Sequence, residues 1–242
     1  MFVSRFSQFN TIMSNIISMD WSNVMFLNLE VEENSIRRHI PEDFEIRTYN
    51  SKAYITLVFF NLESPGLKSL SIPISFSEFN IRTYVRYKTF QGIYFLTLDV
   101  KNKLIPICVN NIFKLNYNNT FLSYETKNYS KNAVWKNKKY NIDSLSIEFE
   151  VGKSMKDSSF SNFITENYLY ISKHKNSIYY NNVYHKKWNL NYVNVQSISE
   201  FSLFKQNKIH SAFYCDKLYV RTGFPVRLKK INYDNTYRLH IS

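Results

Sequence analysis

The sequence predicts a mostly β protein of the α+β class with a few short helices. Residues 77–87 alternate polar and apolar side chains, which is the period of a β-strand. Residues 53–60 form a continuous apolar run of strand length, as expected for a strand buried on both faces. Helical spacing is strongest in the short segment 157–168. With 44% hydrophobic and 17% aromatic residues, the chain can fill a sizeable core.

The first half of the chain predicts strands and one helix. In order, these are a strand at 26–31, a helix at 34–39, and strands at 53–60, 77–87, 93–100 and 104–109. Asn34 is the expected helix cap, and Pro41 stops the helix because the residue before a proline is disfavoured in helical geometry. The Ser-Pro-Gly sequence at 64–66 ends the long apolar run. Pro106 makes the last segment an edge or bulged strand, because proline cannot donate to a ladder.

The second half predicts further strands around one helix. In order, these are a pair of solvated strands with a mobile tip in 124–140, a half-exposed strand at 145–151, a helix at 157–168, and a hairpin made of 168–171 and 178–184. Asp157 or Ser158 is the expected helix N-cap. The chain shows no internal repeat and no linker, so residues 19–242 are expected to form a single domain after a flexible leader at 1–18.

Charge, hydropathy and cysteine content argue against several classes of protein. The net charge is +12, but Lys and Arg occur in short scattered runs, which favours a solvated surface over a nucleic-acid interface. No apolar run approaches the roughly 20 residues of a membrane span, and the N-terminus lacks the apolar region of a signal peptide. Cys108 and Cys215 lie far apart in apolar surroundings and are expected to be buried free thiols. Together these observations predict a cytoplasmic protein.

No motif in the sequence predicts a metal or a cofactor. His39, His174, His210 and His240 share no ligand spacing with an acid or a cysteine. The chain has no Gly-rich phosphate loop, no Gly-x-Ser-x-Gly and no His-Glu-x-x-His. We therefore expect neither group to be bound.

One face of the strand at 77–87 is polar. It carries, in order, Glu78, Asn80, Arg82 and Tyr84. Such a set is costly to bury without partners, so this face lies either in solvent or toward a ligand. Glu78 and Arg82 lie about 13 Å apart along an extended chain and cannot pair with each other. Arg82 is expected either to clamp a carboxylate or phosphate, or to form a structural ion pair with an acid such as Glu166 or Asp99.

Two further residues are candidates for the same site. Tyr94, like Tyr84, can donate a hydrogen bond into a pocket, although a tyrosine in a chain with 19 of them is more often a packing residue. His185 is either a general base or ligand-binding group, or a satisfied histidine at a strand end. The sequence leaves both alternatives open.

Several motifs occur in the order seen in a known family. They are Trp21 with Phe26, Ile40-Pro41, the block from Glu78 to Asp99, Thr165-Glu166-x-Tyr168-x-Tyr170 and His185-x-x-Trp188-x-Leu190. From about Trp21 to the C-terminus, the chain resembles the YqjF-like family, an uncharacterised bacterial group similar in fold to acetoacetate decarboxylase. The resemblance implies a large antiparallel β-barrel of the acetoacetate-decarboxylase type, with a pocket inside and helices packed outside.

The resemblance also implies which chemistry is missing. In the decarboxylases a lysine forms a Schiff base, and the segment that carries it matches residues 110–118 here. Tyr117 stands at the position of that lysine, and Lys114 lies three residues earlier. Glu78 matches a pocket glutamate of the decarboxylases. The resemblance therefore implies a pocket without imine chemistry.

These observations predict a protein that binds a small anionic organic molecule, such as a carboxylate. The expected binding residues are Glu78, Asn80, Arg82, Tyr84, Tyr94, Tyr117 and His185. The alternative is a non-catalytic interaction or nucleic-acid-binding protein that uses its basic surface and exposed aromatic residues. A weak decarboxylase that uses Lys114 is a third hypothesis.

Overall fold

The computed structural model describes residues 16–67, 70–127, 130–137, 142–199 and 208–228. Within these ranges it has three helices, α2 (Glu33–Arg37), α3 (Leu104–Phe113) and α4 (Ser159–Thr165), and none of them is long and apolar enough to cross a membrane. The strands are β1 (Ile17–Val31), β2 (Glu45–Ile46), β3 (Ala53–Leu67), β4 (Leu70–Ser71), β5 (Ser75–Tyr87), β6 (Phe90–Val100), β7 (Tyr117–Asn119), β8 (Phe121–Lys127), β9 (Ser130–Asn137), β10 (Ile142–Ser154), β11 (Leu169–His174), β12 (Ser177–His185), β13 (Asn191–Ile198), β14 (Lys208–Thr222) and β15 (Val226–Leu228).

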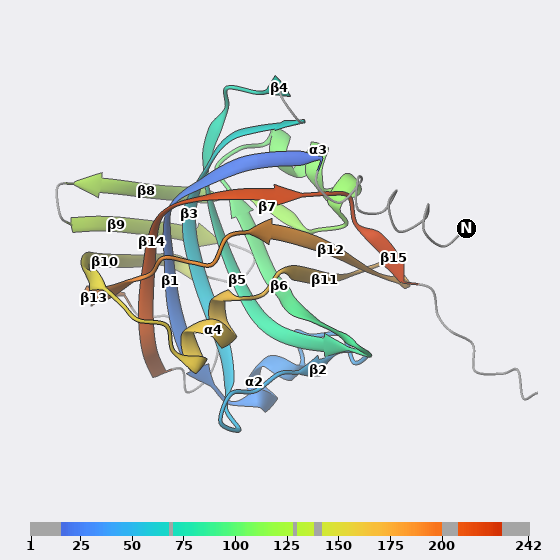
Figure 1. Cartoon of the computed structure of the whole chain (residues 1–242), viewed down its shortest axis with the longest axis horizontal. Helices are drawn as coiled ribbons and strands as arrows, with labels where there is room; N and C mark the ends of the chain where they lie inside the picture. Colours follow the sequence, from blue (N-terminus) through green and yellow to red (C-terminus); the bar gives the residue numbers. More distant parts are fainter. Residues whose placement is uncertain (1–15, 68–69, 128–129, 138–141, 200–207, 229–242) are drawn as a thin grey trace, which may run out of the picture.

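Seven strands close into a ring. Its order is β12–β11–β6–β5–β3–β1–β14, and β14 pairs back to β12, for example through Val183 and Thr222. Neighbours in the ring are antiparallel except β6 and β11, which are parallel and pair at Ile93 and Tyr170. Figure 1 shows β1, β3, β5 and β6 side by side along this ring. The arrangement confirms the predicted mostly β fold with a large, mainly antiparallel barrel.

The remaining long strands cover the outside of the ring. From β14 the sheet continues through β13, β10, β9 and β8, which pack over the outer faces of β1, β3 and β5. In the apolar cluster between them, which we call the back core, the rings of Phe79 and Trp135 lie 4.4 Å apart. The strands β1, β3 and β5 therefore bury one face in the back core and the other inside the ring. This explains why 53–60 is apolar at nearly every position.

The prediction of a strand at 104–109 is wrong, because these residues form the first part of helix α3. Pro106 falls in the first turn of the helix, where its missing N–H is not needed. The side-chain oxygen of Asn102 accepts hydrogen bonds from the backbone N–H of Leu104 (2.8 Å) and of Ile105 (3.3 Å). Asn102 thus satisfies the open helix end, a role that the apolar run itself does not reveal.

Three predicted boundaries also differ from the structure. The chain bends at Ser64, with φ of 47°, and β3 continues to Leu67 instead of ending at 64–66. The helix predicted at 34–39 is α2, and its N-cap is Glu32 instead of Asn34. Strand β1 begins at Ile17, inside the segment expected to be a leader, and residues 1–15 lie outside the described residues.

The helix predicted at 157–168 is the shorter α4. Ser158 is its N-cap, and a capping box joins Ser158 and Ser161 through hydrogen bonds of 3.0 and 2.9 Å. The helix ends at Thr165, so Tyr168 lies beyond it. The hairpin predicted after it is confirmed as β11 and β12.

Two predictions of exposure are partly wrong. The strands predicted in 124–140 are β8 and β9, but they are not a solvated pair, because Trp135 and Ala133 are fully buried against the back core. Their predicted mobile tip includes residues 128–129, which lie outside the described residues. Of the two cysteines expected to be buried, Cys215 is buried, whereas Cys108 is exposed because it lies on α3.

Substitution of Gly92 tests how closely β6 and β11 approach each other. A Cβ at this position would overlap the backbone carbonyl oxygen of Leu169 in β11. Because a backbone atom cannot rotate away, Gly92→Ala must push the two strands apart, and we expect the free energy of unfolding to fall by about 1–3 kcal/mol. Urea denaturation followed by circular dichroism measures this loss.

Gly152→Ala is the matched control. Its Cβ would lie 3.2 Å from the carbonyl oxygen of Tyr192, a contact that a small shift relieves. If Gly92→Ala lost no more stability than Gly152→Ala, the close approach of β6 and β11 would be contradicted.

Candidate functional site

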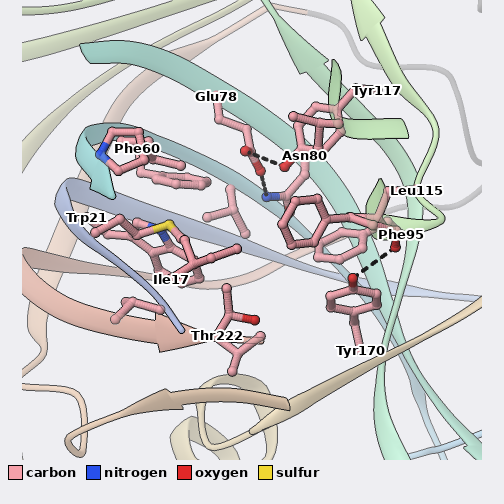
Figure 2. A pocket seen from close by; sticks show the side chains of 18 of the residues that line it. Ile17, Trp21, Phe60, Glu78, Asn80, Phe95, Leu115, Tyr117, Tyr170 and Thr222 are labelled. Atoms are coloured by element: carbon pink, nitrogen blue, oxygen red, sulfur yellow. Dashed lines mark hydrogen bonds between the residues drawn. The ribbon is translucent and has the colours of Figure 1, made fainter. Parts of the chain in front are cut away.

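The ring encloses a cavity of about 470 Å³. Each of its seven strands supplies lining side chains, for example Val24, Phe60, Arg82, Phe95, Tyr170, His185 and Thr222 in the order β1, β3, β5, β6, β11, β12 and β14. Helix α3 lines one end of the cavity. In Figure 2, Glu78, Asn80 and Tyr117 form a polar group on the wall, while Ile17, Trp21 and Phe60 gather at another part of it.

Strand β5 points three of the predicted residues into this cavity. Glu78, Asn80 and Arg82 line it, and only 4%, 3% and 7% of their respective surfaces are exposed. The intervening Phe79 and Ile81 point into the back core. The polar face of β5 therefore lies inside the ring and not in bulk water.

Glu78 is a buried carboxyl group with two hydrogen-bond donors. The Tyr117 hydroxyl donates to one of its oxygens (2.9 Å), and the Asn80 side-chain amide donates to the other (3.1 Å). Burial disfavours the charged form and raises the pKa of Glu78 to about 7, although both hydrogen bonds oppose this shift. Burial and the nearby Glu78 also raise the pKa of Tyr117. Near neutral pH, Glu78 can therefore either hold or release a proton.

Arg82 is a buried guanidinium without a carboxylate partner among the described residues. It donates to the backbone carbonyl of Ile164 (3.3 Å), and its guanidinium lies 5.2 Å from the centre of the Phe26 ring. Its Nε has no hydrogen-bond partner. The positive charge is therefore held in place by the protein but is not neutralised by it.

Neither acid considered as an ion-pair partner contacts Arg82. Glu166 accepts hydrogen bonds from the backbone N–H of Trp188 (3.3 Å) and from the Tyr168 hydroxyl. Asp99 points into the back core, where it accepts hydrogen bonds from four side chains, including those of Trp135 (2.6 Å) and Asn137 (2.8 Å). Burial raises the pKa of Asp99, and its hydrogen bonds oppose this. Both acids are thus satisfied elsewhere.

Three residues of the cavity wall carry buried polar atoms without a partner. These atoms are Nε1 of Trp21, Oδ1 of Asn80 and Nε of Arg82. A buried polar atom left unpaired costs about 1–3 kcal/mol, so most are paired with protein, water or ligand. Two donors and one acceptor on residues of the cavity wall are therefore left without a partner among the described residues.

The structure does not place Tyr84 and Tyr94 on the cavity wall. Tyr84 is buried, and its hydroxyl lies 2.6 Å from the Thr56 hydroxyl; burial raises the pKa of Tyr84, and the nearby charge of Arg82 opposes this. Thr56 in turn donates to Asn28 (2.9 Å), so Tyr84 belongs to a buried hydrogen-bond network with these two residues. Tyr94 points to the opposite side of the sheet and packs against Phe44, with 5.6 Å between ring centres.

His185 does line the cavity, as predicted. Its Nδ1 lies 2.7 Å from the backbone oxygen of Lys186, and its ring stacks on Tyr168. Burial lowers the pKa of His185, which favours the neutral ring. In that form Nδ1–H donates to the backbone, and Nε2 is left as an acceptor.

Tyr117 is held against Glu78 by the end of α3. The Asn110 side chain accepts from the backbone N–H of Tyr117 (2.6 Å) and donates to its carbonyl oxygen (3.0 Å). Lys114 instead occupies the end of the helix, where its ammonium donates to the Asn111 carbonyl (2.5 Å) and is exposed. Among the described residues that line the cavity, none is a lysine.

Sequence reasoning missed Trp21 and the cavity-lining residues of α3. Trp21 was singled out only as part of the family motif, because its place on the cavity wall depends on the ring bringing β1 next to the other strands. The residues of α3 were assigned to a strand, and their spacing at Leu104, Ile105 and Cys108 is the helical signal that was available. Within the described part of the chain, no cluster of His, Cys, Asp and Glu could hold a metal ion.

Comparison with known proteins identifies similar families and folds. The model of the family DUF2071, described as "Uncharacterized conserved protein", matches residues 18–219. Over 201 residues the chain is 28% identical to "Uncharacterized protein YqjF" of Bacillus subtilis (strain 168), covering 76% of this chain and 80% of that protein. These matches confirm the resemblance stated from the motifs.

Solved structures with the same fold include acetoacetate decarboxylase from Legionella pneumophila (TM-score 0.60, 10% identity, 88% of both chains covered). An acetoacetate decarboxylase-like enzyme from Sphingomonas wittichii RW1 gives a TM-score of 0.62 at 7% identity, covering 89% of this chain and 94% of that one. The enduracididine biosynthesis enzyme MppR complexed with pyruvate gives 0.61 at 7% identity, with 90% and 92% covered. At these identities the likeness shows the fold alone.

Glu78→Gln tests the raised pKa. The ordinary pKa of a glutamate is 4.5, and that of Glu78 is about 7 in the folded protein. Between these values the folded state keeps a proton that the unfolded state has lost, so stability falls as pH rises from 4.5 to 7. Over this range, wild type should lose about 2–3 kcal/mol relative to Glu78→Gln.

Urea denaturation at pH 5, 6, 7 and 8 measures this difference. Glu150→Gln removes an exposed glutamate of β10 and should follow the wild-type pH profile. Parallel profiles for wild type and Glu78→Gln would show that Glu78 is charged throughout.

Proposed function

We propose that this protein, which belongs to the DUF2071 family, binds a small organic carboxylate inside its ring of strands. The observation that carries the proposal is Arg82, a guanidinium that is 7% exposed, lines the cavity and has no carboxylate partner among the described residues. A ligand carboxylate would supply the missing negative charge.

The surroundings of Arg82 favour a carboxylate over a neutral ligand. A buried charge is stable only when it is paired and hydrogen-bonded, and a guanidinium can hold a carboxylate through two parallel hydrogen bonds. The Nε of Arg82 is a donor without a hydrogen-bond partner among the described residues. The Ile164 carbonyl accepts a hydrogen bond from the guanidinium, which also lies over the Phe26 ring.

Glu78 and Asn80 would contact a second polar group of the ligand. The unpaired Oδ1 of Asn80 accepts a hydrogen bond, and Glu78 is either donor or acceptor according to its protonation. A hydroxyl or carbonyl group suits this pair. Glu78 also gives the cavity a group that can exchange a proton with a ligand near neutral pH.

The fold relatives support the same class of ligand. The structure of MppR was obtained with pyruvate, which is a small carboxylate. Because the identity to MppR is 7%, this supports the choice of ligand class and assigns no reaction to this chain.

Two broader features belong to the same proposal. Residues 19–242 act as one domain, since the described strands belong to one sheet. The protein works in the cytoplasm, where thiols stay reduced, and both of its cysteines are free.

Arg82→Gln tests the carboxylate site. Isothermal titration with pyruvate and with butanoate should show about 10- to 100-fold weaker binding than wild type, because a charge-assisted hydrogen-bond pair is lost. Arg82→Lys keeps the positive charge but lacks the planar guanidinium, so its affinity for both acids should lie between those of wild type and Arg82→Gln.

Arg86→Gln is the control, since Arg86 lies on the same strand but is exposed and pairs with Glu45 (2.9 Å). It should bind both acids as wild type does. Equal dissociation constants for wild type and Arg82→Gln would remove Arg82 from the binding site.

Borohydride trapping tests the absence of imine chemistry. Because Tyr117 occupies the lysine position implied by the resemblance and Lys114 lies away from the cavity wall, reduction in the presence of pyruvate should add no mass to the protein. Intact-mass spectrometry measures this. An adduct mapped to Lys114 would revive the decarboxylase hypothesis.

A further inference from the structure

The charged groups of the cavity lie toward its inner end. Along β5, the residues that line the cavity are Phe76, Glu78, Asn80 and Arg82. An extended strand rises about 3.3 Å per residue, so Arg82 lies about 20 Å from Phe76 along β5. The register with β3 sets Leu62 beside Phe76, and the register with β1 sets Trp21 beside Leu62. Beyond Glu78 the part of the wall formed by β5, β3 and β1 thus becomes apolar. On another part of the wall, Thr222 lies beside Ile17 and accepts a hydrogen bond from Asn181 (3.0 Å).

The outer end of the cavity, which we call the mouth, is lined by Ile17, Ile72, Ile74, Leu104 and Ile105. These residues come from the start of β1, the segment between β4 and β5, and α3, which lie at the same end of the molecule in Figure 1. Leu104 and Ile72 are 68% and 58% exposed, so the cavity opens there. Among the described lining residues, the charged side chains are Glu78 and Arg82, both on β5.

Helix α3 has an apolar face that the protein itself does not cover. Leu104, Ile105, Cys108 and Val109 line the cavity at the spacing of one helix face, yet no residue of α3 is buried. An apolar helix of a soluble domain usually buries such a face. A molecule as short as pyruvate, held at Arg82, would leave this face in contact with water.

We infer that the ligand is an amphipathic carboxylate, whose head contacts Arg82 and whose unbranched apolar tail extends past Glu78 to the mouth beside α3. The inference rests on the proposed function and specifies the class of ligand for the same site. The tail would remove from water the apolar faces of Phe76, Trp21 and α3, which a short acid does not reach.

A chain-length series tests the tail. Dissociation constants are measured by isothermal titration for acetate, butanoate, hexanoate, octanoate and decanoate. Burying one methylene contributes about 0.8 kcal/mol, so affinity should rise about fourfold per carbon until the tail reaches the mouth. Octan-1-ol, which has the tail without the charge, should bind more weakly than octanoate in wild type.

Leu104→Asp and Ile107→Asp form a matched pair on α3. Both positions are mostly exposed (68% and 71%), but Leu104 lines the cavity and Ile107 does not. Leu104→Asp should weaken octanoate binding about tenfold or more and leave butanoate unchanged. Ile107→Asp should leave both unchanged.

The outcomes separate the inference from the function on which it rests. Affinities that are equal from acetate to decanoate but fall in Arg82→Gln would overturn the tail and keep the carboxylate site. Equal effects of Leu104→Asp and Ile107→Asp on octanoate would also overturn it. If octan-1-ol and octanoate bound equally tightly, and Arg82→Gln left the affinity for octanoate unchanged, the carboxylate site itself would be overturned.

Discussion

The pairing of β5 with β3 determines which side chains of β5 face the cavity. Val58 of β3 pairs with Asn80, and Phe59 with Phe79, so neighbouring residues of β5 go to opposite sides of the sheet. Neither side is solvent, because one faces the cavity and the other the back core. A slip of one residue would place Glu78 and Arg82 in the back core, in the positions now filled by apolar side chains such as Phe79 and Ile81. The apolar packing of Phe79 and Ile81 thus holds the polar face in register.

A single irregularity in β6 separates two buried carboxylates that lie on neighbouring strands. The register between β5 and β6 shifts between Ile81 and Arg82, where β6 accommodates one additional residue. As a result, Asp99 pairs with Phe79 and points to the back core, while Glu78 points to the cavity. Asp99 accepts hydrogen bonds from the β9 side chains of Trp135 and Asn137, and Glu78 lines the cavity. Because of the bulge, Asp99 stabilises the packing of the back core, whereas Glu78 lines the cavity.

The two faces of β5 could be told apart from the sequence because they differ in chemistry at every step, and the family resemblance favoured the cavity over solvent for the polar face. Glu78, Asn80 and Arg82 alternate with apolar residues, and all three lie on the cavity wall. Strand β6 offers no such contrast, since Tyr94 stands among apolar neighbours, and its direction depends on pairing with Thr83. Helix α3 was missed because apolar residues occupy several of its faces, so a helical period is hidden in what resembles a strand interrupted by Pro106. The contribution of Trp21 depends on closure of the ring, which no local pattern encodes.

The two cysteines of the chain differ in solvent accessibility, so a thiol-reactive dye can be attached selectively to one of them. Cys108 is exposed on the cavity-lining face of α3, whereas Cys215 is buried and its pKa is raised by burial. A thiol-reactive fluorophore will therefore label the natural chain at one position, without engineered substitutions. That dye would stand at the entrance of the pocket, and its emission would register occupancy directly.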